Sequence, residues 1–416
     1  MDLRDKLKQY ESHVAPKTAA PPKMQRDLVS WIDGQEIESA GGVCFQSLAI
    51  FPEDYVHGAI PLSEIFDHEA FIYQQVGRDP RLGNLDLLKT LFIDTETTGL
   101  AGGTGTVPFL IGLGYFEKSQ FHVEQLFIRD YHEEQAMLHV LAERFGRFDF
   151  LVSYNGKAYD MNLIQSRFLM HRMKNPATDH PHLDLLYPVR RIWQQRLKDC
   201  SLSHIEQKIL NFHRQGDIPG FMIPDIFFRY IRTGDGRELA SVFEHNRWDI
   251  ISLAALISVL GKVHQSPETN LKHPEDLFHH GRSLFHADAL DACLSTLGSL
   301  TNCEKLSPIV EESQLLSSFC YKKLDRWHDA IQLWNQLVEK FPHRLEAYEE
   351  LAKYYEHREK NLDAAIHIVQ RALTRLEVMR QLRPQAEKTE PFALFSHRLQ
   401  RLLRKQNQLG IPPEID

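Results

Sequence analysis

The sequence predicts an α/β domain, with a mixed central sheet flanked by helices, followed by an all-α domain of repeated helices. Segments 91–100 and 151–168 both begin as apolar strands and turn at small polar residues, and the apolar stripe of a helix follows the second. Beyond residue 265 only helical periodicity appears. The expected parts are an N-terminal extension at 1–85, the α/β domain at 86–264, a linker at 265–273, helical repeats at 274–380, and a basic helix and tail at 381–416.

The N-terminal extension carries no motif to which we assign chemistry. Residues 15–24 contain three prolines, which predicts a partly flexible connector. DLVSWIDG (27–34) indicates a short helix. VCFQSLAIFP (43–52) and HGAIPL (57–62) indicate strands that join the sheet of the α/β domain or cover its edge.

An apolar strand in LFIDTETTGL, residues 91–100, ends in two carboxylates, Asp94 and Glu96. Residues two apart on a strand point to the same face, so these like charges lie side by side and need a neutralising partner. A divalent cation such as Mg²⁺ or Mn²⁺ is the simplest partner, because these ions prefer carboxylate oxygens. Taken alone, the pair is more typical of an ordinary strand-to-turn junction than of a metal site.

Two later segments place further polar groups at the ends of elements. In YNGKAYD, Asp160 stands where a helix is expected to begin, five positions after Asn155. In HNRWDIISLAALISVL (245–260), His245 and Asp249 are four residues apart and share a face if the helix covers both. The three segments together offer four carboxylates and one imidazole.

In this order, the three segments resemble the DEDD (DnaQ-like) 3′-to-5′ exonuclease family of the ribonuclease H superfamily. DTETTG resembles the first motif of that family, YNGKAYD resembles the Asn-x4-Asp motif of proofreading exonuclease domains, and a closing Asp follows a general-base position. With helical repeats behind the nuclease domain, the chain is similar to the YprB-like group of bacterial proteins. The resemblance implies a ribonuclease H-like α/β domain and a tetratricopeptide-like repeat domain.

The same resemblance implies roles for individual residues. His245 would be the general base of a hydrolysis that releases nucleoside 5′-monophosphates. Asp184 is also at a family-like position, although an Asp that caps the next helix explains it equally well. The implied ligands of two Mg²⁺ or Mn²⁺ ions are Asp94, Glu96, Asp160 and Asp249. The implied substrate-binding residues are Thr97, Thr98, Gly99, Leu100, Asn155 and Lys157.

The third segment departs from the family pattern. The family has either tyrosine in the spacing Y-x3-D or histidine in the spacing H-x4-D, whereas this chain has His245 at the tyrosine spacing, HNRWD. One residue rotates a helical side chain by about 100°. Glu244 stands at the longer spacing and is the alternative base. A histidine that only caps the helix or lies at the surface is the structural alternative.

The glycine-rich stretch after the first motif is expected to be a hairpin connection. It lacks the Lys-Ser/Thr ending of a P-loop, and an apolar strand (106–116) follows it in place of a helix. A further strand (120–130) would complete an antiparallel arm of the sheet. His180 and His182 flank a proline without the partner ligands of a zinc site, which favours loop histidines.

Composition and charge limit the class of protein. The 416 residues are 43% hydrophobic and 25% charged, as in ordinary globular domains. Five scattered cysteines, no signal-peptide core and no run of about 18 apolar residues predict a cytoplasmic protein without a membrane span. A net charge of −8 opposes binding along a duplex, so we expect metal-dependent engagement of a single-stranded 3′ end of DNA or RNA.

The helical segments beyond residue 273 recur at about the tetratricopeptide length. DRWHDAIQLWNQLVEKFP (325–342) and EKNLDAAIHIVQRAL (359–373) correspond, with Asp329 and Asp363 offset by 34 positions. Such stacks bind a protein partner or only brace a neighbouring domain. Two alternatives to an exonuclease therefore stay open, namely a non-catalytic adaptor that binds nucleic acid or protein and a structure-specific endonuclease.

Overall fold

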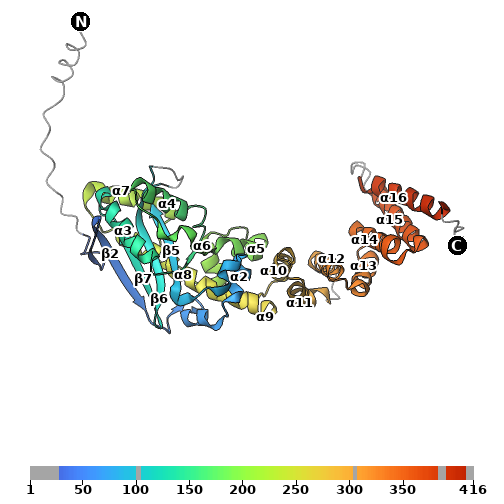
Figure 1. Cartoon of the computed structure of the whole chain (residues 1–416), viewed down its shortest axis with the longest axis horizontal. Coiled ribbons are helices and arrows are strands. Elements are labelled where there is room, and N and C mark those ends of the chain that lie inside the picture. Colours follow the sequence, from blue (N-terminus) through green and yellow to red (C-terminus); the bar gives the residue numbers. More distant parts are fainter. Residues whose placement is uncertain (1–27, 100–104, 303–306, 383–389, 409–416) are drawn as a thin grey trace, which may run out of the picture. The chain divides into compact units, whose positions relative to one another are not determined.

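The computed structural model describes residues 28–99, 105–302, 307–382 and 390–408, and the chain divides into two compact units (Figure 1). The first unit extends to Arg190 and includes Asp199–Gln265, and the second comprises Arg191–Lys198 and the chain from Ser266 onward. Within the described ranges, no helix is both long enough and apolar enough to span a bilayer.

A mixed sheet of seven strands forms the centre of the first unit, in the order β1-β2-β7-β6-β5-β8-β9. The pairs β5–β8 and β8–β9 are parallel, and the other neighbouring pairs are antiparallel. The expected hairpin therefore joins β5 to β6, and the strand expected at 43–52 extends the sheet beside β7. The strands are β1 Gln35–Ser39, β2 Gly42–Phe51, β5 Thr90–Thr97, β6 Pro108–Glu117, β7 Gln120–Phe127, β8 Phe150–Ser153 and β9 His182–Asp184, and a separate two-stranded ladder pairs β3 Val56–His57 with β4 Ile60–Pro61.

Helices cover the central strands on both faces, which explains why β6 reads as a continuous apolar run. Its residues are buried from Pro108 to Phe116. Helix α3 contacts β1 and β2, whereas α8 contacts β5, β6 and β7. The helices of the chain up to residue 265 are α2 Phe71–Gly77, α3 Glu134–Phe145, α4 Asp160–Met170, α5 Leu186–Leu197, α6 Leu202–Ile205, α7 Ile223–Thr233 and α8 Leu239–Gln265.

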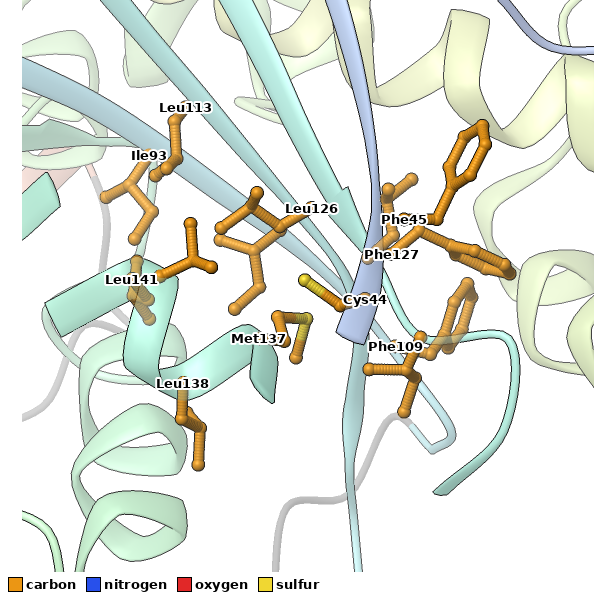
Figure 2. Close-up of a cluster of buried hydrophobic side chains, with 14 of the residues drawn as sticks. Cys44, Phe45, Ile93, Phe109, Leu113, Leu126, Phe127, Met137, Leu138 and Leu141 are labelled. Carbon is orange, nitrogen blue, oxygen red and sulfur yellow. The ribbon is translucent and has the colours of Figure 1, made fainter. Parts of the chain in front are cut away.

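One core of the first unit fills the space between the sheet and α3. Figure 2 shows Ile93 of β5 and Leu126 of β7 facing Met137 and Leu141 of α3, all of them buried. Successive residues of a strand point to opposite faces. Because Ile93 faces α3, the side chain of Asp94 lies on the opposite face of β5. The apolar half of β5 thereby anchors the strand whose other half carries the carboxylates.

Two local expectations need correction or extension. The helix expected at 27–34 is wrong for the described residues 28–34, which form a single turn in which Trp31 and Ile32 donate to the Leu28 carbonyl. These seven residues lead directly into β1 at Gln35, so a helix here would have at most two turns and would be marginal on its own. The helix expected from residue 245 begins earlier, at Leu239, and therefore contains the whole third segment.

The described residues of the second unit from 266 onward form helices and the turns that connect them. Each helix from α10 to α16 contacts the next along the chain. Trp334 lies at the centre of one core and donates through Nε1 to Ser318 Oγ over 2.8 Å. The helices are α9 Pro267–Asn270, α10 Pro274–His286, α11 Leu290–Thr301, α12 Pro308–Lys323, α13 Trp327–Lys340, α14 Leu345–Tyr354, α15 Leu362–Leu382 and α16 Glu390–Gln408.

Candidate metal centre at the end of strand β5

Two glycines of β6 let α8 lie directly against the sheet. Gly112 pairs with Asp94 across the β5–β6 ladder. A Cβ atom at Gly112 would lie 2.3 Å from Asn246 Oδ1, and one at Gly114 would lie 2.5 Å from Ile250 Cγ2. Both distances are too short for any other residue, so glycine at these positions permits the close approach of α8.

Asn246 connects α8 to the first carboxylate. Its Nδ2 donates to Asp94 Oδ2 over 2.9 Å. Its Oδ1 accepts from Gln125 Nε2 over 2.9 Å, and the same amide group of Gln125 donates to the Phe243 carbonyl over 2.8 Å. Because Gln125 occupies the carbonyl oxygen of Asn246, the amide nitrogen is the group turned toward Asp94.

The third segment brings an imidazole and a carboxylate to the same place. His245 and Asp249 lie four apart on the continuous helix α8. His245 Nε2 is 3.5 Å from Asp249 Oδ2 and 4.0 Å from Glu96 Oε1. One ligand atom from each of these three residues lies within 4.8 Å of the others. The short H-x3-D spacing therefore still places the imidazole beside the carboxylates.

Asp160 joins the group from the start of α4. It is buried, and it accepts a hydrogen bond from Thr95 Oγ1 of β5. The loop before it is tight, since a Cβ at Gly156 would lie 2.4 Å from Ser153 Oγ and 3.1 Å from Asp160 Oδ2. The turn after β8 thus needs glycine to bring this carboxylate back to β5.

Burial and mutual repulsion make this group costly without a cation. Burial, with the charges of Asp249 and of neighbouring carboxylates, raises the pKa of Asp94 and of Glu96 well above their usual values. Burial likewise raises the pKa of Asp160 to about 6, although the Thr95 hydroxyl opposes this shift. Carboxylate oxygens are the donor set that suits Mg²⁺ or Mn²⁺, and the imidazole of His245 lies beside them.

The other residues of the second motif contribute through the backbone. Asp184 accepts from the backbone N–H groups of Asn155 (2.8 Å), Lys157 (3.1 Å) and Leu186 (3.1 Å). Asn155 adopts a positive φ of 65°, and its side chain and that of Lys157 are exposed. Asp184 therefore both shapes the loop after β8 and caps the beginning of α5.

The residues after the first motif form a bonded turn. Thr97 Oγ1 and Tyr159 Oη both donate to the Gly99 carbonyl over 2.8 Å. Thr98 pairs with Val107 through its backbone N–H and its hydroxyl, at 3.0 Å each. Leu100 lies outside the described residues. Glu244, the alternative base, is exposed on α8.

Several polar residues of this site were missed in the sequence. Asn246 and Gln125 are buried, and nothing local distinguishes them from surface amides. Arg214 and Asp217 come from the loop between the π-helical turn Glu206–Leu210 and α7. In the sequence they stand in the polar run HRQGD (213–217), which has no helical or strand periodicity and therefore gives no indication of where its side chains point.

A comparison with known protein families agrees with the fold of the first unit. Residues 91–261 match the profile of the RNase_H_2 family, and the first unit therefore contains an RNase_H superfamily domain. The expected ribonuclease H-like fold is confirmed at that level. Members of this superfamily are usually nucleases that use divalent metals, which indicates a hydrolase acting on nucleic acid.

A bacterial protein is similar over most of the chain. The uncharacterized protein YprB of Bacillus subtilis (strain 168) is 29% identical over 329 residues, which cover 78% of this chain and 79% of YprB. Among solved structures, the family B DNA polymerase from the hyperthermophilic archaeon Pyrobaculum calidifontis aligns with a TM-score of 0.34 and 12% identity. That alignment covers 58% of this chain and 29% of the polymerase.

Proposed function

We propose that this protein is a metal-dependent 3′-to-5′ exonuclease that hydrolyses phosphodiester bonds at single-stranded ends of DNA or RNA. The observation that carries the proposal is the meeting of Asp94, Glu96, Asp160 and Asp249 beside His245. Their carboxylates interact electrostatically with one another although they come from β5, α4 and α8. The direction of cleavage rests on the resemblance of the three motifs to the DEDD exonucleases.

The carboxylates fit a pair of divalent ions. Four converging negative charges in a mostly buried setting favour a form in which cations replace the protons that burial would otherwise retain. The ions, when bound, supply charge neutralisation at the scissile phosphate and activation of the attacking water. The four ligands would be Asp94, Glu96, Asp160 and Asp249.

The protein groups around the ligands have distinct tasks in this proposal. His245 Nε2 would accept the proton of the attacking water, since it faces Glu96 and Asp249. Asn246 donates to one oxygen of Asp94, and Thr95 donates to one oxygen of Asp160. In each carboxylate the other oxygen stays available for a bond to the metal. The reaction would release a nucleoside 5′-monophosphate and leave a 3′-hydroxyl on the shortened strand.

Contacts to the terminal nucleotide would come from the turn that follows β5 and from the loop before α4. Thr97, Thr98 and Gly99 follow the ligands directly, and Tyr159 fixes Gly99 through its carbonyl. The exposed ammonium of Lys157 suits a phosphate oxygen. Leu100 and Asn155 complete the set that the resemblance implies.

Labelled oligonucleotides test the proposal directly. Purified full-length protein is incubated with 3′-labelled and 5′-labelled single strands of DNA and of RNA, with Mg²⁺ or with Mn²⁺. We expect mononucleotide release from the 3′ end, no release by Asp94→Ala, and unchanged release by Glu244→Ala, which alters an exposed acid beside the site. Internal fragments would support the endonuclease, and intact label under every condition would support the adaptor.

Thermal unfolding tests metal binding without catalysis. Ligands that bind only the folded state raise the melting temperature. We expect millimolar Mg²⁺ or Mn²⁺ to raise that of the wild type and not that of an Asp94→Asn, Asp160→Asn double variant. A rise retained in the double variant would place the metal elsewhere.

We further propose that the second unit is a stack of tetratricopeptide-like repeats that binds a protein partner or braces the nuclease domain. Two features support this proposal. Consecutive helices contact one another from α10 to α16, and Asp329 of α13 and Asp363 of α15 are 34 residues apart, the tetratricopeptide length. Co-purification of the tagged full-length chain with a partner, lost when surface residues of α10 to α16 are changed, would support binding over bracing.

A further inference from the structure

A buried arginine from outside the three motifs reaches the third carboxylate segment. Arg214 donates through Nη2 to Asp249, and through Nε and Nη2 to Glu206 over 2.7 Å each. Its Nη1 lies 3.2 Å from Asp217 Oδ2. The guanidinium side chain is only 6% exposed, so it holds protein carboxylates and does not face solvent.

The partners of Arg214 are themselves fixed from behind. Ser252 Oγ donates to Glu206 Oε1 over 2.5 Å, and His57 Nε2 lies 2.7 Å from Ser252 Oγ. Glu206 and His57 are both buried. This chain of contacts joins the N-terminal ladder β3–β4 to α8 and leaves Arg214 little freedom to move toward a substrate.

Asp217 holds the imidazole of the candidate base. His245 Nδ1 lies 2.7 Å from Asp217 Oδ1, which also accepts from the backbone N–H of Ile218 over 2.9 Å. A carboxylate oxygen only accepts hydrogen bonds, so His245 Nδ1 carries a proton. Arg214 Nη1 lies 3.2 Å from the same nitrogen, which is farther than Asp217. A protonated Nδ1 cannot accept a hydrogen bond, so Arg214 is near this nitrogen without donating to it.

The consequence of this tautomer lies on the other side of the ring. With the proton on Nδ1, a neutral imidazole has its free electron pair on Nε2. That nitrogen is the one 3.5 Å from Asp249 and 4.0 Å from Glu96. The contact with Asp217 thus bears both on the orientation of the His245 ring and on which ring nitrogen can accept a proton.

We propose that Asp217 is the positioning residue of His245, with Arg214 fixing Asp217 and Asp249 relative to each other. The inference rests on the proposed nuclease function for its catalytic meaning. It also gives a physical account of the shortened H-x3-D spacing. At this spacing the ring of His245 is oriented by the carboxylate of Asp217, which comes from a different segment of the chain. Among the described contacts, Asp217 bonds to His245, to Arg214 and to the backbone of Ile218, and not directly to a proposed metal ligand.

The first test is spectroscopic and needs no turnover. Full-length, metal-free protein labelled with ¹⁵N-histidine is examined at pH 8, and His245 is assigned by its absence in His245→Gln. We expect the wild type to show the Nδ1-protonated tautomer, and Asp217→Ala to shift the ring to a mixture of both tautomers. Asp225→Ala, which alters an exposed acid of α7, is the matched control and should leave the tautomer unchanged.

The second test is a double-mutant cycle on the nuclease reaction. Loss of a group that orients a reacting residue costs about 10-fold to 100-fold in activity. We expect Asp217→Ala to lower kcat by that factor with KM within about twofold, and to cause no further loss when combined with His245→Ala. The melting-temperature rise with Mg²⁺ should persist in Asp217→Ala, because all four carboxylate ligands remain.

The two tests separate failure of the inference from failure of the proposed function. A tautomer unchanged by Asp217→Ala, or losses that multiply in the double variant, would overturn the positioning role. A wild type without turnover on any strand or metal would overturn the nuclease proposal, while the ¹⁵N spectra would still decide whether Asp217 orients His245.

Discussion

Asn246 of α8 donates to Asp94 of β5 over 2.9 Å, directly above the position where β6 has Gly112 in place of a side chain. This bond ties the helix that carries His245 and Asp249 to the strand that carries Asp94 and Glu96. The site therefore depends on close packing between two elements that are remote in the sequence.

A methyl group at Gly112 should separate these elements. Gly112→Ala would place a Cβ 2.3 Å from Asn246 Oδ1, and overpacking of this kind costs about 1–3 kcal/mol. We expect lower stability in denaturant unfolding together with loss of the metal-dependent rise in melting temperature. Gly220→Ala, where a Cβ would meet nothing within 4 Å, should change neither measurement.

His245 and Glu244 are adjacent in the sequence, but the His245 side chain is only 15% exposed whereas Glu244 is exposed, and this makes them a matched pair. His245→Ala should lower kcat by about 100-fold to 10,000-fold, the usual contribution of a general base. Glu244→Ala should leave kcat unchanged, because its side chain is exposed on α8. Single-turnover measurements at saturating Mg²⁺ would distinguish the two, and equal losses would contradict the assignment of the base.

Stability of the metal-free protein should depend on pH through Asp160. Burial raises the pKa of Asp160 to about 6 in the folded protein from its ordinary value of 3.8. Between these values the folded state binds more protons than the unfolded state, so this group makes stability fall as pH rises from about 4 through 6, by roughly 3 kcal/mol in all.

Comparison of Asp160→Asn with the wild type isolates that contribution. In EDTA, denaturant unfolding between pH 4 and pH 8 should show the variant gaining stability relative to the wild type up to about pH 6. Above that value the difference should stay constant. Parallel curves over the whole range would show that Asp160 does not titrate with a raised pKa.

Arg214 should be far more important for stability than a surface arginine. Removal of one partner from a buried ion pair costs about 3–5 kcal/mol, because the remaining charges are left without compensation. Arg214→Met should therefore lower the free energy of unfolding by an amount in that range. Arg237, which is paired with Asp235 at the surface, is the control. Arg237→Ala should have the same free energy of unfolding as the wild type.

The sequence predicted the parts of the site that depend on local order. Asp94 and Glu96 follow an apolar strand, Asp160 begins a helix, and His245 and Asp249 share a helical face, and each of these relationships can be deduced from spacing alone. The α/β domain and the helical region that follows were predictable for the same reason, since strand and helix periodicities are local properties.

The missed residues depend on tertiary contacts. Asn246 acquires its role only when β6 presents Gly112 opposite Asp94. Arg214 and Asp217 lie in a loop without periodicity, and their position is set by Glu206 and His245. The turn at 28–34 was mistaken for a helix because its composition suits both conformations, whereas the entry of the chain into β1 permits only a turn.

The separation of the ligands along the chain has a consequence during synthesis. β5 and α4 leave the ribosome well before α8, so a nascent chain possesses Asp94, Glu96 and Asp160 while His245 and Asp249 are still untranslated. Such a fragment cannot assemble the full centre. The carboxylates of β5 and α4 therefore have no partners from α8 until translation has passed Asp249.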